Sequence, residues 1–407
     1  MQRDHEPTFE PPEKVAADED VIDMSRFATD DSDETKPSHH NAQSNKQGVG
    51  SRLKAWWSAR PAWQKIAIIV ALVLLIIGSV TGVYLGVFKK SASKTVTVQP
   101  QPQAKPEPPK PTTEASTLTG VQVPIGTNQT PVTGIMIENS PDARPQSGLN
   151  AAGVVFEAIA EGGITRFLTL FQESQPEYVG PVRSVRPYYI RWARGFDAPI
   201  AHVGGSAEAL QMIRSPGYKD LDQFFNPGPY WRIPQRYAPH NMYTSVPKLI
   251  ELEKSKGFTS STFTGFPRKA EKPAATPTAK SIDFTISSPL YYAHYDYDAS
   301  TNSYKRSEGG KPHVDEKSGA QLNPKVVIAI VLQQGIDADG IHTSYNVFGN
   351  GKAYIFQDGT VTEGTWSKEN ETSQIRFGDA NGSPIALNAG QTWITAVGSP
   401  NYVKFTP

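Results

Sequence analysis

The stretch FEAIAEGGITRFLTLF, residues 156–171, decides how the first folded segment is interpreted. Two apolar runs flank a Gly-Gly pair, which predicts two β-strands joined by a tight turn. Glu157, Glu161 and Arg166 lie in or beside these runs, although charges are rare in half-buried strands unless they are paired or used. Residues an even number apart share a face of a regular strand, so we expect the two glutamates on one face.

Two interpretations of these charges stay open. In the first, carboxylate–guanidinium pairs hold the surrounding loops in place. In the second, the glutamates do acid–base work across a sugar bond and nearby arginines hold an anionic ligand. The candidate catalytic residues are Glu157 and Glu161, and the candidate ligand-binding residues are Arg166, Arg183, Arg186, His202, Gly204, Gly205, Ser206, Arg232, His240 and Asn241.

The segment AHVGGS, residues 201–206, predicts a strand followed by Gly-Gly-Ser at a helix start. Backbone N–H groups there can bind a phosphate or carboxylate, or the glycines can form an ordinary tight turn. His202 and His240, with a glutamate, have the chemistry of zinc ligands, but neither shows the spacing of a zinc motif. We therefore predict no metal and no cofactor.

Outward from the hairpin, residues 118–257 alternate strand-like and helix-like patterns. Ser184, Ser206 and Ser245 are the predicted N-caps of three helices, and Gly257 follows the last of them. This predicts a mixed α/β (α+β) N-terminal unit. Residues 258–280 are rich in Ser, Thr, Pro and Ala and are predicted to be a linker.

Residues 281–407 are predicted to form a mainly-β C-terminal unit. The runs YYAHYDYD and SYKRSEGG are predicted to pair, and the alternating sequence around Asp358–Gly359 predicts a further hairpin.

Residues 66–88 contain no charged side chain, and about 34 Å of helix is enough to cross a bilayer. The preceding segment, 51–65, is basic and aromatic. It holds four Lys/Arg residues, whereas the segment just after the span holds three, and this excess favours a cytoplasmic N-terminus. Residues 1–50 carry twelve acidic and five basic side chains and are predicted to be a disordered tail. Residues 89–117 are Pro-rich and are predicted to be an extended linker.

The segments GIMIENSPDARPQSGL, EAIAEGGITRF, GPVRSVRPY, AHVGGS and APHNMYTS resemble the YerB-like family of bacterial extracytoplasmic proteins. The resemblance covers roughly residues 118–405, and it continues in AYIFQDGTVTEGTW and LNAGQTWI. It implies a domain with separate N- and C-terminal parts, often carried by lipoproteins, and it implies no catalytic residue. The chain departs from the lipoprotein pattern because it contains no cysteine, so the apolar helix is the expected anchor.

These features predict a single-pass membrane protein of the bacterial envelope whose extracytoplasmic part binds cell-wall polymer or a cell-wall assembly partner. The alternative is a glycan-cleaving envelope enzyme, a hydrolase or lyase, that uses a glutamate as acid or base. The 40 basic and 40 acidic side chains balance, so nucleic acid is not an expected partner.

Overall fold

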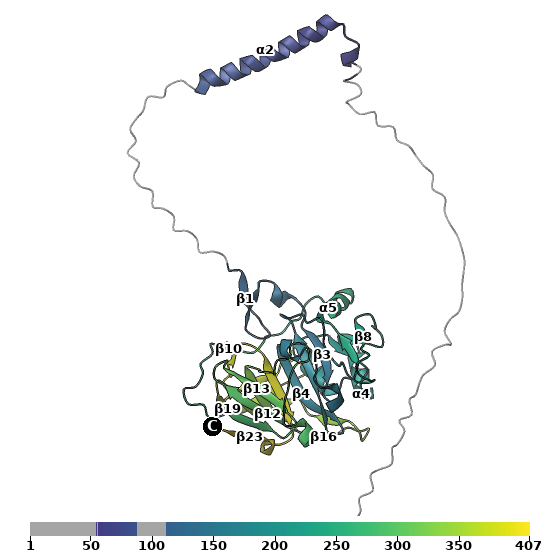
Figure 1. Cartoon of the computed structure of the whole chain (residues 1–407), viewed down its shortest axis with the longest axis vertical. Helices are drawn as coiled ribbons and strands as arrows, with labels where there is room; N and C mark the ends of the chain where they lie inside the picture. The colour runs from purple at the N-terminus through teal and green to yellow at the C-terminus, as the bar shows by residue number, and fades with distance from the viewer. Residues whose placement is uncertain (1–53, 55, 88–110) are drawn as a thin grey trace, which may run out of the picture. The chain divides into compact units, whose positions relative to one another are not determined.

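The computed structural model describes residues 54, 56–87 and 111–407, and these belong to two compact units. The first contains the long helix α2 (Ala62–Val87), and the second is a globular body (Figure 1). The predicted tail 1–50 and most of the predicted linker 89–117 lie outside the described residues.

Helix α2 begins at Ala62 and includes nearly all of the predicted span 66–88. Its window Ala62–Ser79 has a mean hydropathy of 2.1 and is not buried. Among the described residues this is the one helix long and apolar enough to cross a membrane.

The body is built on a ten-stranded mixed sheet and a five-stranded antiparallel sheet. In spatial order the large sheet contains β20 (Arg376–Gly378), β19 (Thr360–Lys368), β18 (Gly349–Gln357), β15 (Val326–Val331), β22 (Thr392–Val397), β4 (Val154–Glu161), β5 (Ile164–Phe171), β3 (Thr133–Glu138), β6 (Ile200–His202) and β7 (Asp220–Asp222). The five-stranded sheet contains β14 (Lys311–Pro312), β13 (Ser303–Glu308), β12 (Ala293–Asp298), β11 (Ser281–Phe284) and β23 (Val403–Thr406).

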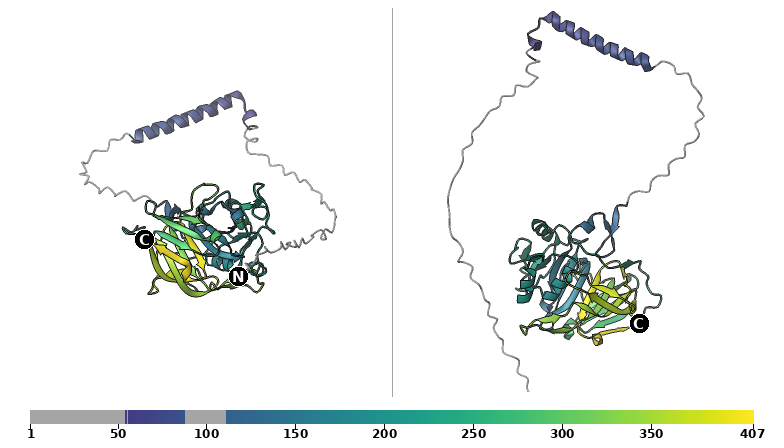
Figure 2. Two further views of the ribbon diagram at one scale, coloured as in Figure 1. Left: turned by 60° about the horizontal axis from the view of Figure 1, so that its bottom comes forward. Right: turned by 180° about the vertical axis from the view of Figure 1, so that it is seen from behind.

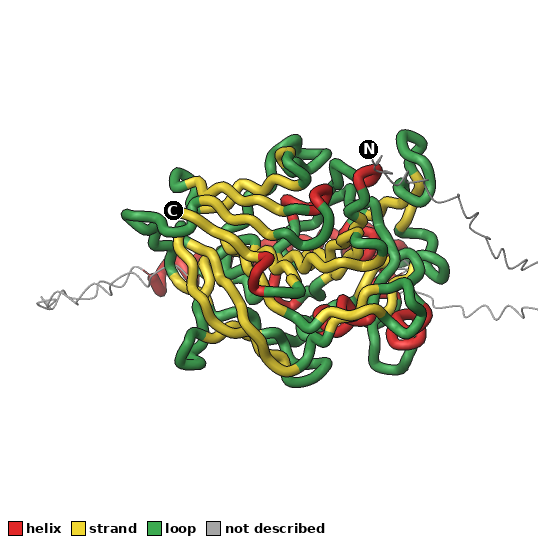
Figure 3. Tube along the Cα trace, turned by 90° about the horizontal axis from the view of Figure 1, so that it is seen from below, coloured by secondary structure: helices red, strands yellow, loops and turns green. Residues whose placement is uncertain are grey.

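Short two-stranded ladders, three α-helices and five short 3-10 helices make up the rest of the regular structure of the body. The ladders join β1 (Thr113–Ala115) to β2 (Gln122–Pro124), β8 (Tyr230–Arg232) to β9 (Met242–Thr244), β10 (Arg268–Lys269) to β21 (Leu387–Asn388), and β16 (Gln334–Ile336) to β17 (Thr343–Tyr345). The helices are α3 (Pro187–Arg194), α4 (Ala207–Ile213) and α5 (Val246–Ser255). Figure 3 shows that strands dominate the body and that its helices are short.

The two segments 118–257 and 281–407 contribute strands to the same large sheet. Strand β22 lies between β15 and β4 and runs parallel to both. Both β15 and β22 read as nearly continuous apolar runs, as expected of strands covered on both faces. Figure 2 shows the teal and yellow-green parts of the chain side by side in one body. The mixed α/β class is confirmed, and the α-helices of the body all lie in the first segment.

The ranges predicted as linkers also hold structure. Strand β1 begins at Thr113, and the range 258–280 contains β10 and the buried ring of Phe266. Both therefore belong in part to the folded body.

Helix α3 and the five-stranded sheet cover opposite faces of β4. On one face, the Tyr188 and Tyr189 hydroxyls donate to carbonyls of β4, and Trp192 stacks on Phe156 at 5.0 Å. On the other face, Arg306 of β13 reaches Glu157. Side chains of β4 therefore enter one of two different interiors according to which face they occupy.

Two of the three predicted helix caps are confirmed. Ser206 accepts from the Ala209 amide at the start of α4, and Ser245 accepts from the Lys248 amide at the start of α5. The predicted cap at Ser184 is wrong, because α3 begins at Pro187 and Arg186 occupies the N-cap position without a side-chain cap. Proline fits the first helical position, where an N–H would have no helical acceptor.

Candidate functional site

A β-bulge near the end of β4 sends its two glutamates to opposite faces. The pairing of β4 with β5 shifts between Ile159 and Glu161. An extra residue on one strand breaks the alternation of side chains. The expectation that the two glutamates share one face held only for a strand regular up to the turn; it is therefore wrong, and the two glutamates do not form one pair.

Glu161 joins two arginines on the face covered by α3. Its carboxylate accepts from Arg166 of β5 and, at 2.6 Å, from Arg186 at the N-cap of α3. Burial alone would raise the pKa of Glu161, but the two guanidinium groups outweigh it and hold that pKa below its ordinary value. Glu161 is thus an ionised anchor, and its side chain stays 24% exposed.

A second carboxylate, Glu138 at the end of β3, lies on the same face because it pairs across the ladder with Arg166. Its Oε1 lies 3.4 Å from Arg183 Nε and 2.9 Å from His240 Nδ1. Ser140 donates to the same oxygen at 3.0 Å. Glu138 itself is buried, whereas the Arg183 side chain is 25% exposed.

We call Arg166, Arg183 and Arg186, with Glu138 and Glu161, the arginine cluster. Its three guanidinium groups face two carboxylates, so the cluster carries an excess positive charge. Burial lowers the pKa of both Arg183 and Arg186, and the neighbouring Arg166 lowers both further. In the described body, Arg166 Nε, Arg186 Nε and Glu138 Oε2 are buried without a hydrogen-bond partner. The cluster therefore keeps both charge and donor capacity that its own residues do not satisfy.

Glu157 lies on the other face, with no exposed surface. One oxygen accepts from Arg306 at 3.0 Å, and the other accepts from Trp393 Nε1 at 2.9 Å. Arg306 is equally buried and also donates to Tyr295 and to His313 Nδ1. The structure thus assigns Glu157 a buried ion pair that links the two sheets.

Arg306 and its neighbours were not among the residues predicted from the sequence. The alternation of Tyr304, Arg306 and Glu308 in the sequence places them on one face of β13. The structure shows that all three are buried on that face. Burial raises the pKa of Glu308 above its ordinary value, and Arg306 opposes that shift. Glu308 also lines a cavity of about 370 Å³ with Arg144 and other residues.

The predicted anion site at AHVGGS already holds a carboxylate of the protein. Asp222 is buried and accepts from the Gly204 amide at 3.2 Å and from Arg214. The Gly205 backbone forms a bridge with Val185, and the Ser206 side chain caps α4. The amide of Gly204 is therefore already engaged within the protein.

His202 lies apart from the arginine cluster's contacts and is fully buried. Its Nε2 lies 3.0 Å from Asp220, and its Nδ1 lies 2.8 Å from the Gly204 carbonyl. Both ring nitrogens are thus engaged in fixing the loop after β6. No group of three or more His, Cys, Asp or Glu side chains in the described ranges is arranged to hold a metal ion.

Arg232 and Asn241 form a separate contact at the end of the β8–β9 ladder, where Arg232 donates to Asn241 Oδ1 at 2.6 Å. Asn241 immediately follows His240, so this ladder positions the histidine that contacts Glu138. The structure therefore brings Glu161, Arg166, Arg183, Arg186 and His240 together, directly or through Glu138.

Comparison with known proteins matches two family models to the body. Residues 118–259 match the N-terminal domain, and residues 282–394 the C-terminal domain, of the "Protein of unknown function (DUF3048)" family. "Putative lipoprotein YerB" of Bacillus subtilis (strain 168) is 32% identical over 285 residues, which cover 69% of this chain and 85% of the relative. The crystal structure of YerB from Bacillus subtilis matches with a TM-score of 0.66 and 28% identity, over 72% of this chain and 100% of the solved one. The chain belongs to the DUF3048 family and is a homologue of YerB.

Proposed function

We propose that this protein is anchored in the bacterial membrane by α2 and that its body binds an anionic cell-wall polymer at the arginine cluster. In this proposal the N-terminus is cytoplasmic and the body is extracytoplasmic. The length and hydropathy of α2 support the anchor. The name of the relative supports an envelope location, and the absence of cysteine means that this chain lacks the residue that carries a bacterial lipid anchor.

The observation that carries the proposal is the excess positive charge of the arginine cluster, of which Arg183 is a partly exposed member. Guanidinium groups bind phosphate and carboxylate through paired N–H donors. Polymers of the bacterial wall carry such groups along carbohydrate-rich chains. Arg183 is the member of the three arginines that the polymer can reach, because its side chain is 25% exposed whereas those of Arg166 and Arg186 are nearly buried.

Binding accounts for the two candidate glutamates better than cleavage does. Glu157 has no exposed surface, and protein donors contact both of its oxygens. A general acid needs a raised pKa, whereas the pKa of Glu161 is lowered by its two arginines. The enzymatic alternative therefore becomes an outcome of the binding test.

The test measures co-sedimentation of the full-length chain, in detergent, with insoluble cell-wall sacculi. Sacculi stripped of their anionic polymers are compared with untreated ones. Arg183→Gln removes one partly exposed charge of the cluster. Arg191→Gln is the matched control, because Arg191 is 24% exposed and pairs at 3.4 Å with Glu208, which is not part of the arginine cluster.

We expect the parent chain to sediment with untreated sacculi and to bind stripped sacculi weakly. Arg183→Gln should lower the affinity about tenfold, as expected for one lost charge-assisted hydrogen bond, and Arg191→Gln should leave it unchanged. Equal loss in both variants would contradict the assignment of the site. Release of soluble glycan fragments by the parent chain would favour the enzymatic alternative instead.

A further inference from the structure

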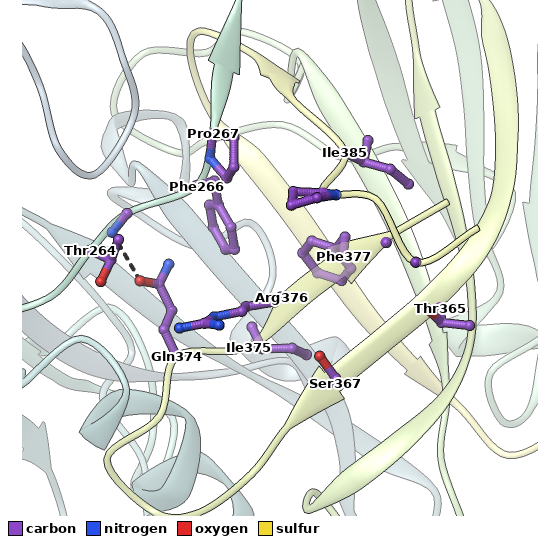
Figure 4. A pocket seen from close by; sticks show the side chains of 14 residues that line it. Thr264, Phe266, Pro267, Thr365, Ser367, Gln374, Ile375, Arg376, Phe377 and Ile385 are labelled. Atoms are coloured by element: carbon purple, nitrogen blue, oxygen red, sulfur yellow. Dashed lines mark hydrogen bonds between the residues drawn. The ribbon is translucent and has the colours of Figure 1, made fainter. Parts of the chain in front are cut away.

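A cavity of about 610 Å³ lies between residues 264–267 and strand β20. It contains no residue of the arginine cluster, and the family descriptions give it no role. We call it the Gln374 pocket. The Phe266 and Phe377 rings, 5.7 Å apart, form one side of it (Figure 4). Its volume falls within the range of small-ligand sites in proteins.

The amide of Gln374 is fixed in one orientation. Its Oε1 accepts from the Gly265 amide at 2.9 Å, and only an oxygen can fill that position. Its Nε2 is buried and has no hydrogen-bond partner in the described body, and the residue is only 9% exposed. A buried N–H without an acceptor is costly, so this nitrogen marks a place for one.

A second donor lines the same pocket. Figure 4 shows the Arg376 side chain extending from β20 toward the Gln374 amide. Arg376 is exposed and lines the pocket, and no carboxylate of the described residues pairs with it. The pocket lining thus holds a guanidinium group and an unpartnered amide N–H, two kinds of donor from which a carboxylate accepts.

The wall that carries Gly265 is held firmly. Gly265 has a φ of +75°, and a Cβ there would lie 2.2 Å from the Thr117 carbonyl oxygen. The carbonyl of Pro267 accepts from the Leu387 amide at 2.8 Å. The donor side of the pocket is therefore preorganised, which lowers the entropy that a ligand must lose on binding.

We propose that the Gln374 pocket binds an apolar carboxylate, with the acid between Gln374 and Arg376 and the apolar group against Phe266 and Phe377. The acid can be a small molecule or the C-terminal residue of a peptide, because both present the same groups. This site shares no residue with the arginine cluster, so the test of ligand binding here does not depend on the proposed function.

The experiment is isothermal titration of the full-length chain in detergent, with ligands dissolved in the same detergent buffer. The first probe is N-acetylphenylalanine, which carries a phenyl ring and a free carboxylate. Its primary amide, which has no charge, is the matched ligand control. A pentapeptide with a free C-terminal phenylalanine separates the two sources, since a pocket for peptide ends should bind it more tightly than the single residue.

We expect the acid to bind at least about tenfold more tightly than the amide, as for one charge-assisted contact. Gln374→Glu keeps an oxygen for the Gly265 amide but replaces the free donor by a carboxylate, and it should abolish binding of the acid. Arg376→Gln should weaken the acid about tenfold and leave the amide unchanged. Lys404→Gln, at an exposed position of β23, controls for loss of any surface charge.

Three results would overturn the proposal. These are equal binding of the acid and the amide, no effect of Arg376→Gln, and no heat of binding from any of the three probes up to millimolar concentrations. An unchanged thermal unfolding midpoint in Arg376→Gln would show that lost binding is not lost folding.

Discussion

Replacing the buried Glu253 by glutamine should stabilise the body, and the gain should grow with pH. Glu253 lies on α5 with no exposed surface. Thr133 donates to its Oε1 at 2.8 Å, while Oε2 has no hydrogen-bond partner among the described residues. Burial raises the pKa of Glu253 from 4.5 to about 8, and the Thr133 hydroxyl and the distant charge of Lys219 offset this only in part.

The sign follows from proton binding. Between the unfolded pKa of 4.5 and the folded pKa of about 8, the folded state holds a proton that the unfolded state has released. Stability therefore falls as the pH rises through this window and is constant above it. A shift of this size corresponds to about 4–5 kcal/mol at most, at about 1.4 kcal/mol per pKa unit. Glutamine cannot ionise, so it removes this penalty.

The assay is urea unfolding of the parent chain, Glu253→Gln and Glu251→Gln at a series of pH values from about 4 to 9. Glu251 is an exposed neighbour on the same helix and serves as the control. The midpoints of the parent and Glu253→Gln should agree near pH 4 and separate progressively up to about pH 8, with the variant more stable. Parallel curves for these two proteins would refute a buried carboxyl with a raised pKa.

Three further perturbations test other parts of the structure. Arg306→Leu leaves Glu157 charged and buried, so the free energy of unfolding should drop by about 3–5 kcal/mol, and the double variant with Glu157→Leu should recover much of that loss in urea unfolding. Gly265→Ala places a Cβ against the Thr117 carbonyl at a positive φ, so we expect a loss of about 2 kcal/mol or more, seen as a lower thermal midpoint. Deletion of residues 56–87 should move the chain from the membrane pellet to the soluble fraction after cell lysis, and retention in the pellet would show that another segment holds it.

Local patterns were readable from the sequence because they depend on nearby residues. The Gly-Gly turn between β4 and β5, the hairpin around Asp358–Gly359 and the caps at Ser206 and Ser245 are all confirmed. Each depends on turn or capping chemistry within a few positions. The cap at Ser184 failed because proline at position 187 sets the start of α3.

Features that depend on distant segments were not readable. The parallel pairing of β22 with β4 joins residues more than 200 positions apart, and no local pattern specifies it. The bulge at Glu161 separates it from Glu157, and hydrophobic alternation does not reveal an added residue. From the sequence, Arg166, Arg183 and Arg186 were predicted to belong to one site, but Glu138 was not predicted to be part of that site.

The central claim, that the arginine cluster binds an anionic polymer, is tested most directly by affinity as a function of salt. Soluble poly(glycerol phosphate) is titrated into the full-length chain and into Arg183→Gln, with neutral dextran as the control polymer. We expect the parent chain to bind the polyanion and added salt to weaken that binding steeply by screening. The variant should bind more weakly, with a shallower salt dependence. Equal binding of dextran and polyanion, or the same salt dependence in both proteins, would contradict the central claim.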